Sequence, residues 1–265
     1  MKIDPLTALL NQHAGQQGPV MLMYHSVLPG KGTPAWPWAV SMQRFRDQLD
    51  FLATAGYATP TIAELITMPD KQWPARTAVI TFDDGYVDNF DAYEELLKRG
   101  MRASWFIVSG SVGQVPLWRA NGRPEGRLLN VAELNEMQEN GMEIGSHTVN
   151  HLRLTEVEDD RLNKELIDSK ATLEDMLGKR VSSFAYPYGA WDTRCAEAVR
   201  QAGYTAACIT RTGWALRDGN PYQLRRLTVF NTDTANTLAR MLYFGSHNVR
   251  WRDIAGYALR RLFRK

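Results

Sequence analysis

Short apolar runs, rich in β-branched and aromatic residues, alternate along this chain with longer amphipathic segments. The alternation is typical of βα units, in which helices join parallel strands. The runs expected as strands lie at residues 20–24, 77–82, 103–108, 143–145, 183–186, 204–209 and 224–229. This order favours a distorted (β/α)7-type barrel, an α/β fold, over an open doubly wound sheet. Such a barrel carries its functional side chains at the C-terminal ends of its strands, so the residues that follow each strand are the candidates for a site.

Two segments carry the helix start signal known as a capping box, in which two side chains satisfy free amides of the first turn. One is Thr61 with Glu64, and the other is Thr155 with Glu158. The helix expected after Thr155 ends at Gly178, because glycine favours the left-handed C-terminal cap.

The 265 residues are 44% hydrophobic, which is enough to bury one large core. We expect one principal domain at residues 19–235, an N-terminal extension at 1–18 and a C-terminal extension at 236–265, where the βα rhythm stops. The formal net charge of +2 gives no reason to expect nucleic acid as a partner. Cys195 and Cys208 are not at ligand spacing and are expected as plain buried thiols.

The two ends of the chain bear on where the protein works. The apolar patch at residues 8–10 is too short for the core of a signal peptide, and no run reaches the ~20 apolar residues that span a bilayer. The expected location is therefore the cytoplasm. Within residues 250–265, apolar residues recur at helical spacing between arginines. That pattern fits a terminal helix packed on the barrel, or a basic amphipathic helix in peripheral contact with the inner face of the membrane.

Two adjacent carboxylates, Asp83 and Asp84, follow the strand expected at residues 77–82. Two ionised acids in such a place repel each other, and a bound cation relieves the repulsion. Because neighbouring side chains at a strand end point in different directions, one acid can bind a metal while the other faces a substrate. The alternative is a helix N-cap, where aspartate is also favoured.

Two histidines, His147 and His151, follow the strand expected at residues 143–145. Because the two residues are four positions apart, both imidazoles can lie on one face of a helical turn or tight loop. The pair suits a borderline divalent metal with an oxygen ligand. With Asp84 they would form a three-ligand site with an open position for water. The expected ion is Zn²⁺, with Ni²⁺, Co²⁺, Fe²⁺ or Mn²⁺ as alternatives, because ligand type alone does not fix the metal. The alternative is that each is an ordinary core or surface histidine.

Two further strand ends carry candidate groups. Pro187 and Gly189 make an abrupt turn, which can aim the backbone N–H of Tyr188 into a cavity as an oxyanion donor, or can be a turn and nothing more. His25 follows the first strand, and an imidazole with an ordinary pKa near ~6.5 can donate a proton at neutral pH.

These motifs resemble those of the polysaccharide deacetylases of carbohydrate esterase family 4, the NodB-homology domain, over roughly residues 19–229. The sequence TFDDG at residues 81–85 is similar to the family's first motif, and the resemblance implies that Asp83 is a base and Asp84 a metal ligand. The sequence SHTVNH at residues 146–151 is similar to the second motif, and it implies two metal-binding histidines. The resemblance also implies the family's barrel fold and an N-acetylated sugar as substrate.

The chain departs from the commoner family pattern in two places. Ala185 stands where the third motif usually begins with an arginine that orients the base aspartate, and no Leu-x-His motif follows Leu224. The sequence MYH at residues 23–25 instead resembles the poly-N-acetylglucosamine deacetylase branch, in which the acid histidine comes from the first strand. The missing arginine is expected to be replaced in space by Arg226, with Arg225 as the alternative.

The expected function is therefore metal-dependent hydrolysis of an N-linked acetyl group, with Asp83 as base, Tyr188 as oxyanion donor and His25 as acid. Substrate contacts are expected at Tyr188, Pro187 and Trp214, the last as one of several tryptophans able to stack on sugar rings. The expected substrate is a polysaccharide or a glycan precursor, including a lipid-linked sugar. The alternatives are hydrolysis of a non-sugar amide or imide on the same fold, and a non-catalytic glycan-binding scaffold.

Overall fold

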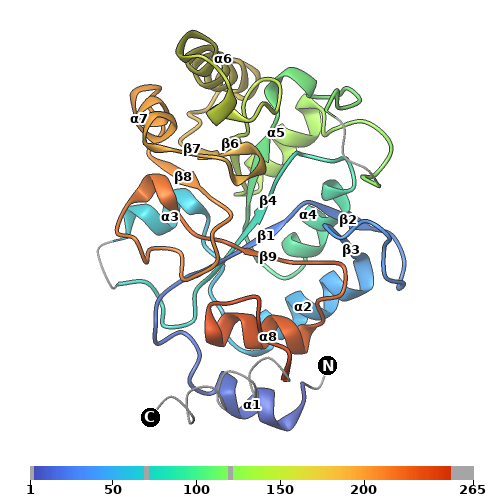
Figure 1. The fold of residues 1–265 in the computed structure, drawn as a ribbon. Helices are drawn as coiled ribbons and strands as arrows, with labels where there is room; N and C mark the ends of the chain where they lie inside the picture. Colours follow the sequence, from blue (N-terminus) through green and yellow to red (C-terminus); the bar gives the residue numbers. More distant parts are fainter. Residues whose placement is uncertain (1–2, 69–71, 119–121, 252–265) are drawn as a thin grey trace.

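The computed structural model describes residues 3–68, 72–118 and 122–251. Its central strands are β1 (Val20–Tyr24), β4 (Ala78–Phe82), β5 (Ser104–Ile107), β6 (Glu143–Ser146), β7 (Ser183–Ala185), β8 (Ala206–Cys208) and β9 (Leu227–Thr228). They form one curled, parallel sheet in the order β8-β7-β6-β5-β4-β1-β9, with helices arranged around it (Figure 1). Each strand falls within or next to one of the expected apolar runs, and the distorted barrel fold is confirmed.

One segment of chain joins the two edges of the curled sheet. Leu224 hydrogen-bonds on the side of β8, since its N–H donates to the Ala207 carbonyl and its carbonyl accepts from Ile209 N–H, both at 2.9 Å. Three residues later, Leu227 pairs with Leu22 of β1. The run expected as the last strand therefore closes the barrel, although only its end is regular strand.

Alternate residues of the strands face two different cores, as the period of two requires. Met21 and Val79 face an inner core that also contains Ile62 and Leu65. The neighbours of each on its own strand face the surrounding helices. Ile62 and Leu65 belong to α3 (Ile62–Thr67), whose first amide donates to the Ser104 hydroxyl at the start of β5. The helix α3 thus fills the N-terminal end of the barrel and leaves the C-terminal ends of the strands for a site.

The remaining helices are α1 (Pro5–Asn11), α2 (Met42–Thr54), α4 (Asn89–Leu97), α5 (Val131–Glu139), α6 (Asp159–Leu177), α7 (Thr193–Gln201) and α8 (Ala235–Phe244). The capping box of Thr61 and Glu64 is confirmed at the start of α3, and Gly178 ends α6 with φ 62° in the left-handed region. A short parallel pair, β2 (Ser26–Leu28) with β3 (Ala39–Ser41), was not expected from the sequence. The cysteine prediction is confirmed, because Cys195 and Cys208 are free and buried.

The expected capping box at Thr155 is wrong. Residues Leu154–Glu156 form a separate short 3₁₀ turn, and α6 begins only at Asp159, with no side-chain cap from Glu158. The reason is tertiary: the Arg194 guanidinium donates to the Leu154 carbonyl at 3.1 Å and to the Val157 carbonyl at 2.9 Å. These bonds hold the segment apart from the helix that follows it.

The predicted N- and C-terminal extensions contact each other at one end of the molecule, where α1 lies beside α8 (Figure 1). The N–H of Asp4 donates to the Asn236 side chain at 2.7 Å, and Arg240 of α8 donates to the Thr7 hydroxyl at 2.9 Å. No helix in the described parts of the chain is long and apolar enough to cross a bilayer. Residues 252–265 lie outside the described residues, so the amphipathic helix expected there stays a prediction.

Candidate metal centre and catalytic cavity

Three predicted ligands converge at the C-terminal edge of the sheet, because β4 and β6 are parallel and end at the same edge. Asp84 follows β4, and His147 directly follows β6. The Oδ1 atom of Asp84 lies 3.2 Å from Nε2 of His151 and 3.5 Å from Nε2 of His147. One ligand atom from each residue lies within 4.8 Å of the other two, and all three side chains are buried. This two-nitrogen, one-oxygen donor set fits a borderline divalent cation.

The outer nitrogens of the two histidines fix which atoms face the cluster. Nδ1 of His147 lies 2.7 Å from the Ala185 carbonyl oxygen, and Nδ1 of His151 lies 3.1 Å from the Tyr188 hydroxyl oxygen. A proton on each Nδ1 makes these contacts hydrogen bonds and leaves the lone pair of Nε2 directed at Asp84. Such outer contacts set the orientation of metal-binding imidazoles. Ala185, where the sequence lacks the usual arginine, contributes through its backbone.

Backbone strain is concentrated at this site. Among the described residues other than glycine, only Asp84, Thr148, His151 and Tyr188 have a positive φ, between 56° and 73°. Such residues are uncommon, and they persist where the surrounding structure forces the conformation, typically at functional sites. The four belong to the three motifs that the sequence singled out.

Asp83 is paired with a buried arginine. Nη1 of Arg226 donates to Oδ1 of Asp83 at 2.6 Å and Nη2 donates to Oδ2 at 2.8 Å, while the arginine side chain is 0% exposed. Burial alone would raise the pKa of Asp83, but the Arg226 guanidinium, with smaller contributions from His147 and His25, holds that pKa below its usual value. Arg225 instead pairs with Asp218 at 2.6 Å. Of the two arginines considered from the sequence, Arg226 is therefore the one beside Asp83.

His25 lies at the junction of β1 and β2 and lines the same cavity. Its Nδ1 atom is buried and has no hydrogen-bond partner among the described residues. Its backbone is held from the start of α4, since the Asn89 side chain donates to the His25 carbonyl at 2.8 Å. Burial lowers the pKa of His25, and the opposing effect of the Asp84 and Asp83 carboxylates is smaller.

The cavity around these groups measures about 430 Å³, and Trp36, Trp38 and Trp118 contribute to its walls. The ring of Trp118 lies against that of His151, with centroids 4.6 Å apart. Trp38 is 40% exposed, so its ring is open to a ligand at the mouth. The sequence reasoning missed Trp38, although it lies only two residues from Trp36 in the same Trp-rich loop.

Tyr188 and Arg153 also line the cavity. Tyr188 is half exposed, and the Arg153 guanidinium carbon lies 4.8 Å from the centre of its ring. Arg153 was also missed by sequence reasoning, although it follows His151 by two residues. Its position next to a metal-ligand motif was the available signal.

Two expected substrate contacts do not line the cavity. Pro187 is buried in the turn that presents Tyr188. Trp214 packs on the end of α8, so closely that a side chain at Gly245 would come within 2.8 Å of its ring. The expectation for Trp214 is therefore corrected, because the tryptophan serves as packing for the helix that follows the barrel.

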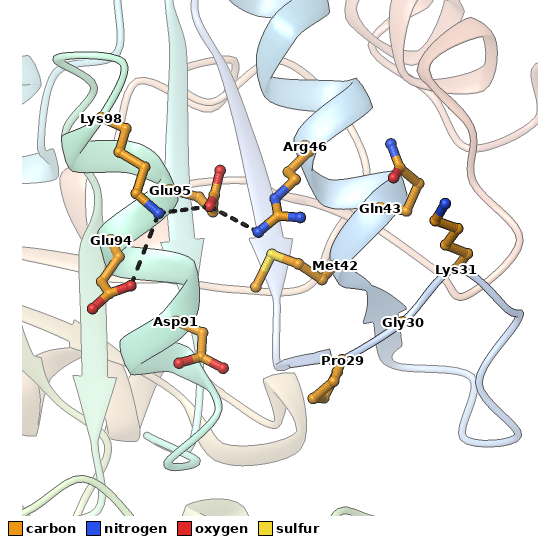
Figure 2. A pocket seen from close by; sticks show the side chains of 10 residues that line it. All are labelled: Pro29, Gly30, Lys31, Met42, Gln43, Arg46, Asp91, Glu94, Glu95 and Lys98. Atoms are coloured by element: carbon orange, nitrogen blue, oxygen red, sulfur yellow. Dashed lines mark hydrogen bonds and ion pairs between the residues drawn. The ribbon is translucent and has the colours of Figure 1, made fainter.

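A second hollow, of about 320 Å³, lies between α2, α4 and the loop at residues 29–31 (Figure 2). Figure 2 shows Arg46 and Lys98 directed at Glu95, at 3.0 and 2.9 Å. These charges neutralise one another across two helices. We therefore assign the chemistry to the cavity with the Asp84, His147 and His151 cluster.

The chain is similar to known proteins in sequence and in fold. The sequence model of the family described as polysaccharide deacetylase matches residues 70–207. A protein of Bacillus subtilis (strain 168) named as a polysaccharide deacetylase, YxkH, is 31% identical over 231 residues, which is 86% of this chain and 77% of that protein.

Solved structures share the fold. The deacetylase PplD of Streptococcus pyogenes, solved with acetate, has a TM-score of 0.73 at 24% identity. The match covers 84% of this chain and 97% of the PplD chain. IcaB from Ammonifex degensii has a TM-score of 0.70 at 25% identity, and the match covers 86% of this chain and 97% of the IcaB chain. Taken with the family match and the B. subtilis relative, these findings show that the chain belongs to the polysaccharide deacetylase family.

Proposed function

We propose that this protein is a metal-dependent hydrolase that removes N-linked acetyl groups from an N-acetylated sugar in a polysaccharide or glycan precursor. The observation that carries the proposal is the juxtaposition of two units in one cavity. One unit is the cluster of Asp84, His147 and His151, and the other is Asp83 held by Arg226. Family membership supports the class of reaction, and the cavity supports the roles of the residues.

Asp84, His147 and His151 would hold one divalent ion, and Zn²⁺ is the first candidate for this donor set. Ni²⁺, Co²⁺, Fe²⁺ and Mn²⁺ are alternatives, because geometry and availability decide between metals that share these ligands. When bound, such an ion polarises a carbonyl oxygen and makes water easier to deprotonate at neutral pH.

Asp83 is suited to take the proton from the attacking water. The Arg226 guanidinium keeps its pKa below the usual value, so the carboxylate is ionised at neutral pH and ready to accept. Arg226 occupies one site on each oxygen, and a carboxylate has about four lone-pair sites, so acceptor capacity remains. Arg226 thus orients the base in the place of the arginine that the sequence lacks at position 185.

Two groups would complete the reaction. The backbone N–H of Tyr188 makes no hydrogen bond within the described residues, and its φ of 59° sets that amide at an abrupt turn in the cavity wall. It would stabilise the negative charge that develops on the carbonyl oxygen. His25, in its protonated form, would donate a proton to the departing amine nitrogen.

The aromatic walls suit a sugar substrate, because indole rings offer flat apolar faces to the faces of sugar rings. Three tryptophans line the cavity, and Trp38 is the best placed of them because it is the most exposed. The test is release of acetate from a panel of N-acetylated substrates: chitin oligomers, poly-N-acetylglucosamine, peptidoglycan fragments and lipid-linked sugars. Release from one class would support the proposal and name its substrate, whereas silence across the panel from metal-loaded enzyme would contradict it.

A further inference from the structure

The turn that carries His151 is held in an unfavourable backbone conformation. Thr148 has φ 70° and His151 has φ 56°, and a β-branched residue such as threonine is a genuine outlier at positive φ. His147 lies at the end of a strand, but His151 depends on this turn for its position. Something outside the turn must therefore fix it.

A buried carboxylate on α6 meets the turn from behind. Glu165 is 1% exposed, and its Oε2 atom accepts the backbone N–H groups of Val149 and Asn150, each at 2.9 Å. Its Oε1 atom accepts the Asn150 side-chain amide at 2.7 Å and pairs with Arg161 at 2.8 Å. One side chain thus satisfies two consecutive amides of the turn.

The other contacts of the turn use different atoms. The carbonyls of Thr148 and Val149 accept from Ser109 and Gly110, both at 3.0 Å. The N–H of His151 donates to the Thr148 hydroxyl at 2.9 Å, within the turn itself. Glu165 is therefore the described acceptor for the amides between the two strained residues.

We propose that Glu165 is a positioning residue for the metal centre, which holds the turn so that Nε2 of His151 faces Asp84. It is not itself a ligand, because its oxygens are taken by the turn and by Arg161, and it stands outside the three-residue cluster. The inference rests on the proposed function in one respect, that Asp84, His147 and His151 bind a metal. Outer contacts of this kind typically change metal affinity by ~10–100-fold.

The test is the affinity of the metal-stripped full chain for Zn²⁺, measured by competition with a chromophoric chelator. Glu165→Ala is expected to weaken Zn²⁺ binding by ~10–100-fold. Glu174→Ala is the matched control, since Glu174 lies on the same helix and its Oε1 accepts the Val181 N–H at 2.8 Å and pairs with Lys170. The control removes a similar structural bond far from the turn, so it should lower thermal stability and leave Zn²⁺ affinity within about twofold of the wild type.

A second variant covers the case in which Glu165→Ala does not fold. Glu165→Gln keeps one acceptor oxygen for the turn but loses the charge shared with Arg161, so its Zn²⁺ affinity should fall below that of the wild type, by less than the ~10–100-fold expected for Glu165→Ala. Wild-type affinity in whichever of the two variants folds would overturn the inference and leave the proposed metal centre intact. Absence of Zn²⁺ binding by the wild type would overturn the metal centre, and the inference with it.

Discussion

The buried pair of Asp83 and Arg226 offers the sharpest mutational test, because it combines a catalytic role with a calculable structural cost. Asp83→Asn preserves the shape of the side chain but removes the charge that accepts the proton. The Arg226 side chain is 0% exposed and would be left as an uncompensated buried cation. Breaking a buried ion pair in this way typically costs ~3–5 kcal/mol.

The expected result has three parts. Acetate release should fall by ~10²–10⁴-fold, the usual contribution of a general base. The Tm should fall by about 6–20 °C, given ~2–4 °C per kcal/mol for a chain of this size. Bound metal, measured by elemental analysis, should stay at the wild-type level, because Asp84, His147 and His151 are untouched.

A double variant separates the two effects. Adding Arg226→Met removes the orphaned cation, and replacement of a buried pair by apolar groups is often neutral for stability. The double variant should therefore recover most of the lost Tm while activity remains low. Near wild-type activity in Asp83→Asn would refute the base assignment, and a double variant as unstable as the single one would refute the electrostatic argument.

Three further predictions address other parts of the molecule. Trp38→Ala should raise KM for glycan oligomers several-fold with a smaller effect on kcat, whereas Trp214→Phe should leave KM unchanged; initial-rate kinetics with both variants would decide. Asn89→Ala removes the bond to the His25 carbonyl, so kcat should fall more than KM rises while Zn²⁺ affinity holds; equal loss of metal binding would show general disruption instead. Burial raises the pKa of Glu95, but hydrogen bonds from the surrounding cations outweigh this effect and lower the pKa to about 2. The stability that Glu95 contributes is therefore present above its unfolded-state pKa of about 4.5 and is lost as the pH falls to about 2. The Tm difference between wild type and Glu95→Gln should accordingly shrink over that interval, and a constant difference would contradict the assignment.

Much of the fold could be predicted from the sequence because most strands of the central sheet lie in contiguous apolar runs. A buried parallel strand such as β4 presents apolar residues to both cores, and the motifs that follow it then lie at one edge of the barrel. The start of α6 could not be predicted in this way. Arg194 bonds to the carbonyls of Leu154 and Val157 across 37 residues or more, and nothing local in the sequence indicates it.

The same division holds for the site. Asp83, Asp84, His147 and His151 form local motifs, so their proximity was predictable from spacing and strand order. Ala185 was recognised as a departure, but the sequence could not show that its carbonyl would orient His147.

Residues that act through the fold were harder to predict. Glu165 lies in the middle of an ordinary amphipathic helix, and Trp38 lies in a loop, so neither has a spacing that marks it. Trp214 had the right residue type for a substrate contact, but its packing partner, Gly245, is 31 positions away and could be known only from the structure.

The metal dependence of the reaction is tested most directly by stoichiometric metal reconstitution of acetate release. The enzyme is stripped with chelator, titrated with Zn²⁺, and assayed on an N-acetylated glycan at each step. Activity is expected to return linearly and to saturate at one ion per chain, and Asp84→Ala is expected not to recover under the same titration. Full acetate release from stripped enzyme, or equal recovery by Asp84→Ala, would contradict the metal dependence.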